Sequence, residues 1–141
     1  MQHAIIVLMS VPTSPQHYVV VLVLDVINGK KTIPNNDIGT IPYGEPVFLT
    51  GDLNCQEEEE AIQLIENDTR KNFKDARKVV SRPEGPRGSV TEFESGRPTK
   101  RIDWLFVYGK VTPVNFRIID DQIQTLKWES DHLPVMFTCK I

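Results

Sequence analysis

The chain has 141 residues, a formal net charge of −3 and a calculated pI near 5.6, which together suit one domain with a single core. This charge argues against a protein that coats nucleic acid, because such proteins normally present a basic face. A phosphate-handling enzyme is not excluded, since a bound cation can attract phosphate to an acidic site. The two cysteines, Cys55 and Cys139, fit neither a zinc site nor a disulfide framework, so we expect two reduced, buried thiols.

The first apolar run, residues 4–11, has no Lys or Arg before it and no convincing small-residue cleavage site after it. A core strand is therefore favoured over a secretory signal. Residues 18–24 are also apolar, but a membrane helix needs roughly 20 such residues. We expect a cytoplasmic protein with no membrane partner, with secretion not excluded.

The first half of the chain alternates strand and loop signals before its clearest helix. Runs rich in Val, Ile and Leu, bounded by Pro or Gly, predict strands at residues 3–9, 16–26 and 46–50. Residues 28–43 carry Gly, Pro and Asn without periodicity and predict a loop. Residues 57–66 predict a helix with four glutamates in its first turn and an apolar face of Ala61, Leu64 and Ile65.

The second half predicts more strand than helix. Residues 73–80 favour a short helix, and residues 82–99, rich in Gly, Pro and charge, favour a long surface loop. Strands are expected at residues 102–108 and 114–119, joined as a hairpin through residues 109–113. The last segment alternates and predicts a core-facing set of Leu133, Val135, Phe137, Cys139 and Ile141. The fold class is therefore α+β, a single domain over residues 1–141 with a sheet-sandwich character and one or two helices.

Three polar clusters each adjoin an apolar, strand-like run: GDLN at residues 51–54, RID at 101–103 and SDH at 130–132. They supply three acids, an amide and an imidazole, which together could hold a divalent cation, orient a water molecule and stabilise a phosphorane. One cluster alone means little, because a Gly-Asp turn after a strand is common. All three, in this order and each tied to a strand, indicate metal-assisted phosphoester hydrolysis.

Each side chain suits one part of that chemistry. Asp52, at the end of a buried strand, could orient or deprotonate the water, and Asn54 could donate its amide to a phosphate oxygen. Asp131 is a hard oxygen ligand suited to Mg²⁺ or Mn²⁺. His132 could donate to the phosphate oxygen if a partner holds its tautomer and keeps it cationic, and Asp103 is the natural candidate.

Simpler structural interpretations stay open for these residues. Asp52 and Asn54 alone could build a turn and cap the helix that follows, which is the favoured interpretation for that pair in isolation. Asp131 and His132 could form a surface turn. Asp103 lies inside an apolar run, where a buried charge needs a partner, so function is favoured at this position.

Two further charged features carry weaker signals. The acidic run at residues 57–60 could bind a cation, but four acids in the first turn of a helix usually form a solvated face that complements the helix dipole. Arg97, Lys100 and Arg101 lie just before the strand that carries Asp103 and could guide a phosphate ligand, although a solvated loop is favoured. Of these, Arg101 is the residue that we predict to bind substrate together with Asn54.

The segments around the three clusters are VFLTGDLNC (residues 47–55), RIDWLFV (101–107) and SDHLPVM (130–136). They resemble the last three signature motifs of the endonuclease/exonuclease/phosphatase superfamily, whose fold is shared with pancreatic deoxyribonuclease. DARKVV (75–80) and PEGPRGSVTEF (83–93) are similar to the segment between these motifs in small bacterial members. The resemblance implies that Asp52 activates water, Asn54 holds the substrate phosphate, Asp131 binds metal, and His132 paired with Asp103 stabilises the phosphorane.

The first third of the chain departs from the family pattern. Family domains are much longer and carry an Asn at the end of their first strand and a metal-binding Glu one strand later, without a recognisable counterpart here. The middle motif, Asn-Thr-His-Leu-Asp-His, would align with residues 21–26, where Leu24 and Asp25 match but Val23 and Val26 replace the histidines. Residues 1–44 are therefore expected to be a poorly matching segment, and residues 45–141 the C-terminal half of a family domain.

The resemblance and the departures lead to two functional hypotheses. The first is a metal-dependent phosphoesterase domain that binds Mg²⁺ or Mn²⁺ at a weak or partial site and has low activity alone. The alternative is a non-catalytic remnant or binding module that acts as a dimer or with a partner chain. Half a sandwich leaves an apolar face or a sheet edge open, so a homodimer or a partner chain is expected in either case. The substrate is a phosphoester; nucleic acid is possible but not indicated by the charge.

Overall fold

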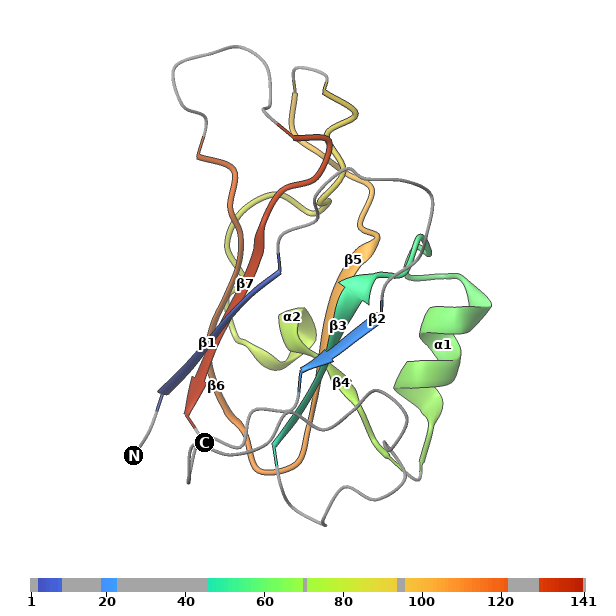
Figure 1. Ribbon diagram of the computed structural model, residues 1–141, viewed down its shortest axis with the longest axis vertical. Helices are drawn as coiled ribbons and strands as arrows, with labels where there is room; N and C mark the ends of the chain where they lie inside the picture. The colour runs from blue at the N-terminus through green and yellow to red at the C-terminus, as the bar shows by residue number, and fades with distance from the viewer. Residues whose placement is uncertain are drawn as a thin grey trace.

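In the part of the chain that the structure describes, seven strands form two antiparallel sheets that face one another (Figure 1). The strand order is β1-β7-β6 in one sheet and β2-β3-β5-β4 in the other. The structure is a computed structural model that describes residues 3–8, 19–22, 46–69, 71–93, 96–121 and 130–140, and for β1 and β2 it describes the backbone alone. The strands are β1 (His3–Leu8), β2 (Val19–Leu22), β3 (Val47–Asp52), β4 (Lys74–Asp75), β5 (Asp103–Tyr108), β6 (Thr112–Ile118) and β7 (Val135–Lys140). The helices are α1 (Glu60–Asn67) and α2 (Ala76–Val79).

This architecture confirms the predicted α+β class and the partial sandwich. The strands expected at residues 3–9 and 46–50 are present as β1 and β3, and β2 lies within the strand expected at residues 16–26. The loop expected at residues 28–43 lies outside the described residues. The division of the chain at residue 45 stays a prediction.

The main core fills the space between the two sheets. Alternate residues of β7 point into it, so Val135, Phe137 and Cys139 are fully buried as the alternation predicted, and Leu133 just before the strand is nearly so. Across from them, β3 and β5 supply Phe48, Leu105 and Val107. The remaining members come from α2 and β6 and are Ala76, Phe116 and Ile118.

Helix α1 covers the outer face of the second sheet (Figure 1). Its fully buried residue is Ile62, and Ile65 packs beside it, whereas Leu64 is 65% exposed and Ala61 is also exposed. The predicted apolar face of Ala61, Leu64 and Ile65 is therefore wrong in two of its three residues. The helix begins at Glu60, so that only this glutamate lies in the first turn. No helix in the described ranges is long and apolar enough to cross a membrane.

Two further local predictions, one of a hairpin and one of a helix, are also wrong. Strands β5 and β6 do not form a hairpin, because β5 pairs with β3 and β4 while β6 pairs with β7 in the other sheet. The segment between them therefore carries the chain from one sheet to the other. Residues 73–80 form the two-residue strand β4 followed by the single-turn helix α2, instead of one short helix.

The predicted surface loop at residues 82–99 is bound to the body of the protein at several points. The amide of Glu84 donates to Phe116 O and its carbonyl accepts from Ile118 N, which fixes the segment along the edge of β6. A Cβ on Gly85, whose φ is +84°, would lie 1.9 Å from Ile118 O, so this contact requires glycine. Further along, the segment contains fully buried Ser89.

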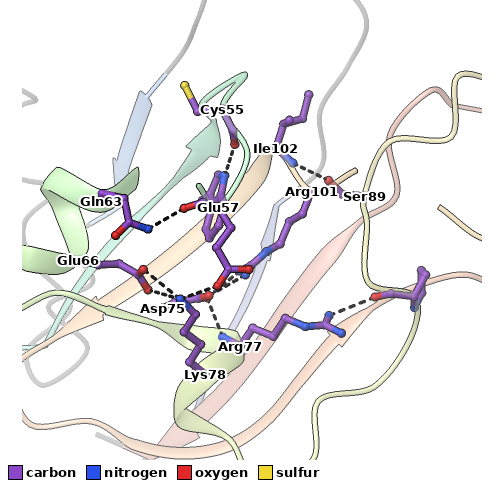
Figure 2. A network of polar contacts seen from close by, with 12 residues as sticks. Cys55, Glu57, Gln63, Glu66, Asp75, Arg77, Lys78, Ser89, Arg101 and Ile102 are labelled. Atoms are coloured by element: carbon purple, nitrogen blue, oxygen red, sulfur yellow. Dashed lines mark hydrogen bonds and ion pairs between the residues drawn. The ribbon is translucent and has the colours of Figure 1, made fainter. Parts of the chain in front are cut away.

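A buried ion pair joins α2 to the start of β5. Asp75, the N-cap of α2, accepts from Arg77 N at 3.0 Å, and both its carboxylate oxygens accept from the guanidinium of Arg101 at 2.6 and 2.7 Å. Figure 2 shows the two side chains pointing at one another. The guanidinium also lies 4.1 Å from the centroid of the Trp104 ring. The side chains of Asp75 and Arg101 are 0% and 8% exposed, so neither charge has an alternative partner in solvent.

We expect Arg101→Met to destabilise the fold by about 3–5 kcal/mol, because the substitution leaves the Asp75 carboxylate buried without its partner. The double variant Asp75→Asn/Arg101→Met keeps a capping side chain and removes both charges, so we expect it to be more stable than Arg101→Met. Urea denaturation at constant pH measures both. A double variant less stable than the single one would show that the buried charge is not the cause.

Candidate functional site

The three polar clusters meet at one end of the sandwich. Because β3 and β5 are antiparallel, the last residue of β3 lies beside the first residue of β5, and Asp52 is directly paired with Asp103. The third cluster precedes β7 in the opposite sheet, where His132 forms an isolated bridge with Val90. Four of the predicted side chains, those of Asp52, Asp103, Asp131 and His132, are thereby brought to the same region.

The closest contact within this group joins the two sheets. The Nδ1 atom of His132 lies 2.7 Å from Oδ2 of Asp103, whose side chain is 2% exposed, while the imidazole is 13% exposed. An Asp–His bond through Nδ1 orients the ring and makes Nε2 the nitrogen that can act on a ligand. The structure thus places Asp103 beside His132, as the need for a partner of a buried charge led us to expect.

The same contact also changes the pKa of the His132 ring. The hydrogen bond to Asp103 raises the pKa of His132 above its ordinary value of 6.5, burial opposes this, and the charges of Asp103, Asp52 and Asp131 add to the rise. The imidazole is therefore more readily cationic in the folded protein than in the unfolded chain.

The strand start that carries Asp103 is held by a buried hydroxyl. Ser89 Oγ accepts long hydrogen bonds from the amides of Ile102, at 3.4 Å, and Asp103, at 3.3 Å. The second carboxylate oxygen, Asp103 Oδ1, is buried and has no hydrogen-bond partner among the described residues. Thr50 Oγ1, on the neighbouring strand, is buried and unpaired in the same sense. An unpaired carboxylate oxygen inside a protein is costly, so this end of the core is polar and has an unmet need for hydrogen-bond donors.

Asp52 and Asn54 form a tight turn at the end of β3. Asp52 Oδ1 accepts from Asn54 N at 2.9 Å, and Asn54 has a φ of +50°, a backbone conformation that Asn tolerates better than most residues. Two contacts fix the turn against β5: Leu53 N donates to Ile102 O at 3.0 Å, and Trp104 Nε1 donates to Cys55 O at 2.8 Å. The N-cap of α1 is Glu59, so this turn does not cap the helix.

Asp131 was the predicted metal ligand. Its side chain is partly buried, and its Oδ1 accepts a marginal hydrogen bond of 3.5 Å from Ser130 Oγ in the same turn. Within the described ranges no three His, Cys, Asp or Glu side chains are grouped as a metal site would require. The described residues therefore do not fit a complete Mg²⁺ or Mn²⁺ site, which needs several oxygen ligands.

Arg101 lies in a position that does not suit contact with a substrate. Its guanidinium is buried against Asp75, and this pairing uses the two nitrogens that would grip a phosphate. We assign Arg101 a structural part, holding the start of β5. Lys100, beside it, is exposed and pairs with Glu92 at 2.7 Å, and Arg97 is exposed.

The acidic run before α1 is likewise engaged with the protein. Glu57 pairs with Lys78 of α2 at 2.8 Å, and Lys78 also binds Glu66 at 2.9 Å (Figure 2). Glu59 accepts from Gln56 N at 2.7 Å. These contacts join the two helices and leave the cation-binding alternative without support in the described residues.

Several residues that build the site were not singled out from the sequence. Ser89 and Thr91 contact the backbone of the Asp103 and His132 segments, and Trp104 ties down the turn after Asp52. The available signal was the likeness of PEGPRGSVTEF to a family segment, because Ser89 and Thr91 lie within it.

The raised pKa of His132 sets a direction for the pH dependence of stability. Protonation favours the folded state, so this contribution is fully present below pH 6.5 and is lost as the pH rises through the raised folded value. We expect that the free energy of unfolding of Asp103→Asn does not fall in this way as the pH rises, because the largest cause of the pKa shift is removed. Urea denaturation at pH values on both sides of 6.5 measures it, with Asp52→Asn expected to keep most of the fall. Parallel curves for wild type and Asp103→Asn would contradict the assignment.

Comparison with known proteins identifies the family of the chain. The endonuclease/exonuclease/phosphatase family profile matches residues 12–132. This match begins well before residue 45, the point from which the sequence motifs resembled the family. No curated protein matches the chain significantly. Among solved structures, a functionally unknown conserved protein from Enterococcus faecalis V583 has 28% identity and a TM-score of 0.59 over 68% of this chain and 36% of that one.

Two further solved structures share the fold at lower identity. An endonuclease/exonuclease/phosphatase from Bacteroides vulgatus has 24% identity and a TM-score of 0.58, over 70% of this chain and 37% of its own. A mannosyl-6-phosphatase from Bacteroides thetaiotaomicron VPI-5482 has 19% identity and a TM-score of 0.58, over 69% of this chain and 38% of its own. The chain therefore spans little more than a third of the length of these proteins. With the profile covering most of its residues, the chain belongs to the endonuclease/exonuclease/phosphatase family.

Proposed function

We propose that this chain carries the phosphate-facing part of a phosphoesterase site, with His132 as the group that acts on the phosphoryl oxygen. The observation that carries the proposal is the 2.7 Å contact between His132 Nδ1 and buried Asp103. Family membership supports it, because this family acts on phosphoesters, and so does the pairing of Asp52 with Asp103 across the sheet. Metal dependence and low activity of the chain alone belong to the same proposal.

The chemistry follows from where the charges lie. In hydrolysis a water oxygen forms a bond to phosphorus while the bond from phosphorus to the leaving alcohol oxygen breaks, and negative charge builds on the other phosphoryl oxygens. A cationic His132, oriented by Asp103, donates from Nε2 to one of those oxygens. Asp52, at the rigid end of β3, accepts the proton of the attacking water. The side-chain amide of Asn54 binds a phosphate oxygen.

A divalent cation would supply further charge compensation at the phosphate. Asp131 is the residue that we propose as one ligand of Mg²⁺ or Mn²⁺. Since the described residues contain no group of three ligands, we expect the affinity of this chain for either cation to be weak. No step above depends on the cation being held by this chain.

A second candidate is a binding module that holds a phosphate group without hydrolysing it. It is favoured by the lack of a grouped metal site in the described ranges and by the limited share of each relative that the chain covers. The same His132–Asp103 pair would bind the anion in both cases. Turnover is thus the property that separates the two functions.

We expect slow hydrolysis of bis(p-nitrophenyl) phosphate with added Mg²⁺ or Mn²⁺, reduced to background by EDTA. Loss of a positioned acid–base group costs roughly 10²-fold or more, so His132→Ala and Asp103→Asn should lower the rate by that order. Asp121→Asn is the matched control, because Asp121 is exposed and pairs with Arg117 at the surface.

The same preparations should be titrated with inorganic phosphate while backbone amide NMR shifts are recorded. Phosphate binding at residues 52–54 and 130–132 without turnover would support the binding module. Rates that His132→Ala and Asp103→Asn leave unchanged would overturn the catalytic proposal, and the lack of both turnover and binding would overturn both candidates.

We also propose that the chain works as a homodimer or with a partner chain. Strands β1 and β2 are edge strands of the two described sheets, and open sheet edges are usually covered by pairing. An interface of at least roughly 1,000 Å² is expected against the sheets. Light scattering over a concentration series should show a mass above that of one chain, and a monomer at high concentration that binds no hydrophobic dye would contradict the expectation.

A further inference from the structure

One short segment touches both partners of the His132–Asp103 pair. Residues 88–91 lie between the start of β5 in one sheet and the turn that precedes β7 in the other. Asp103 is the first residue of β5 in one sheet, whereas His132 lies in the turn that precedes β7 of the other sheet, 29 residues later in the sequence. The pairing between strands of one sheet therefore does not by itself set the distance between them.

On the β5 side the segment is fixed by its backbone and by one hydroxyl. The amides of Ser89 and Val90 both donate to Lys100 O, at 2.8 and 3.1 Å, and Ser89 Oγ accepts from the Asp103 amide. The approach is close enough that a Cβ on Gly88 would lie 2.4 to 2.5 Å from backbone atoms of Thr99 and Lys100. Glycine at this position is what lets the segment lie directly against the residues leading into β5.

On the His132 side the segment binds the turn at three points. Thr91 N donates to Asp131 O at 2.7 Å, Thr91 Oγ1 donates to Ser130 O at 2.7 Å, and Leu133 N donates to Ser89 O at 2.7 Å. Thr91 is 6% exposed, so water does not readily replace its hydroxyl. These contacts surround His132 and hold the backbone on both sides of it.

We propose that Ser89 and Thr91 are positioning residues, which set the His132–Asp103 distance by binding the backbone of both segments. This rests on the proposed function, because the pair they position is the one that acts on the phosphate there. Catalytic groups misplaced by about 1 Å can lose around 10²-fold in rate, so a segment that spans both sheets at this point controls activity without touching the substrate.

The hydroxyl of Thr91 gives the sharpest test. Thr91→Val keeps the shape and removes the hydrogen bonds that the hydroxyl donates to Ser130 O and accepts from Phe93 N, and Thr91→Ser keeps both. Thr99→Val, at an exposed threonine of the same loop, is the matched control. The readouts are the proton NMR resonance of the His132 Nδ1–H, assigned by its loss in Asp103→Asn, the melting temperature, and kcat and KM for bis(p-nitrophenyl) phosphate.

We expect Thr91→Val to shift or broaden the Nδ1–H resonance and to lower kcat about tenfold or more with little change in KM, since geometry and not substrate binding is altered. Thr91→Ser should restore both, and Thr99→Val should match the wild type. A purely structural part would lower the melting temperature while leaving the resonance and kcat of the folded fraction unchanged, and that outcome overturns the proposal.

Ser89→Ala provides a second test if Thr91→Val does not fold, because it removes only an oxygen that accepts long hydrogen bonds. It should shift the same resonance, and an unchanged resonance in this variant would also overturn the proposal. The resonance separates the two levels of the argument. Its loss in Thr91→Val in a chain without hydrolytic activity would support the positioning role and refute catalysis, whereas an unchanged resonance in an active enzyme would do the reverse.

Discussion

The burial of the Asp103 carboxylate is the constraint on which the rest of the site depends. A carboxylate that is 1% exposed requires hydrogen-bond donors, and His132 from the opposite sheet supplies one of them. Two residues earlier, Arg101 brings a second charge into the interior and is matched by Asp75 at the start of α2. The first residues of β5 therefore cannot shift without breaking contacts to β7, to α2 or to the segment at residues 88–91, and the functional groups inherit that rigidity.

Buried ionic contacts of this kind contribute more to geometry than to net stability, since desolvation offsets much of the attraction. The value of the Asp103–His132 contact lies in fixing which ring nitrogen faces outward and in favouring the cationic ring. The inner face of the sheet changes character toward it, from Phe48 and Val107 in the core to Asp52 and Asp103 at the strand ends. One continuous sheet face thus anchors the fold at one end and presents polar groups at the other.

Features that depend on local sequence pattern were predicted correctly. Features that depend on how helices and strands pack against one another were missed. Alternation in β7 identified its core face, and a lone Asp in an apolar run identified Asp103 as a residue needing a partner. The prediction of the buried face of α1 was wrong because periodicity identifies an apolar stripe but not the rotation of the helix against the sheet. In the structure this rotation buries Ile62 and exposes Leu64. The turn residues after β5 did not indicate that the next strand joins the other sheet. Hydroxyl groups such as Thr91 Oγ1 have no recognisable sequence pattern, because their carbonyl partners are known only from the folded structure.

The arrangement of strands also separates the phosphate-facing groups from the first part of the chain. Strands β1 and β2 each lie at the outer edge of a sheet, whereas the described contacts that hold the Asp103–His132 pair come from β3, from Asp75 and from residues 88–133. The pair can therefore be assembled by the C-terminal segments, with β1 and β2 adding width to the two sheets. Cation binding has no comparable set of contacts in the described residues, where Asp131 is the one ligand proposed. Orientation of the imidazole and recruitment of a cation are thus physically separable in the proposed site, which would let phosphate binding persist where hydrolysis is weak.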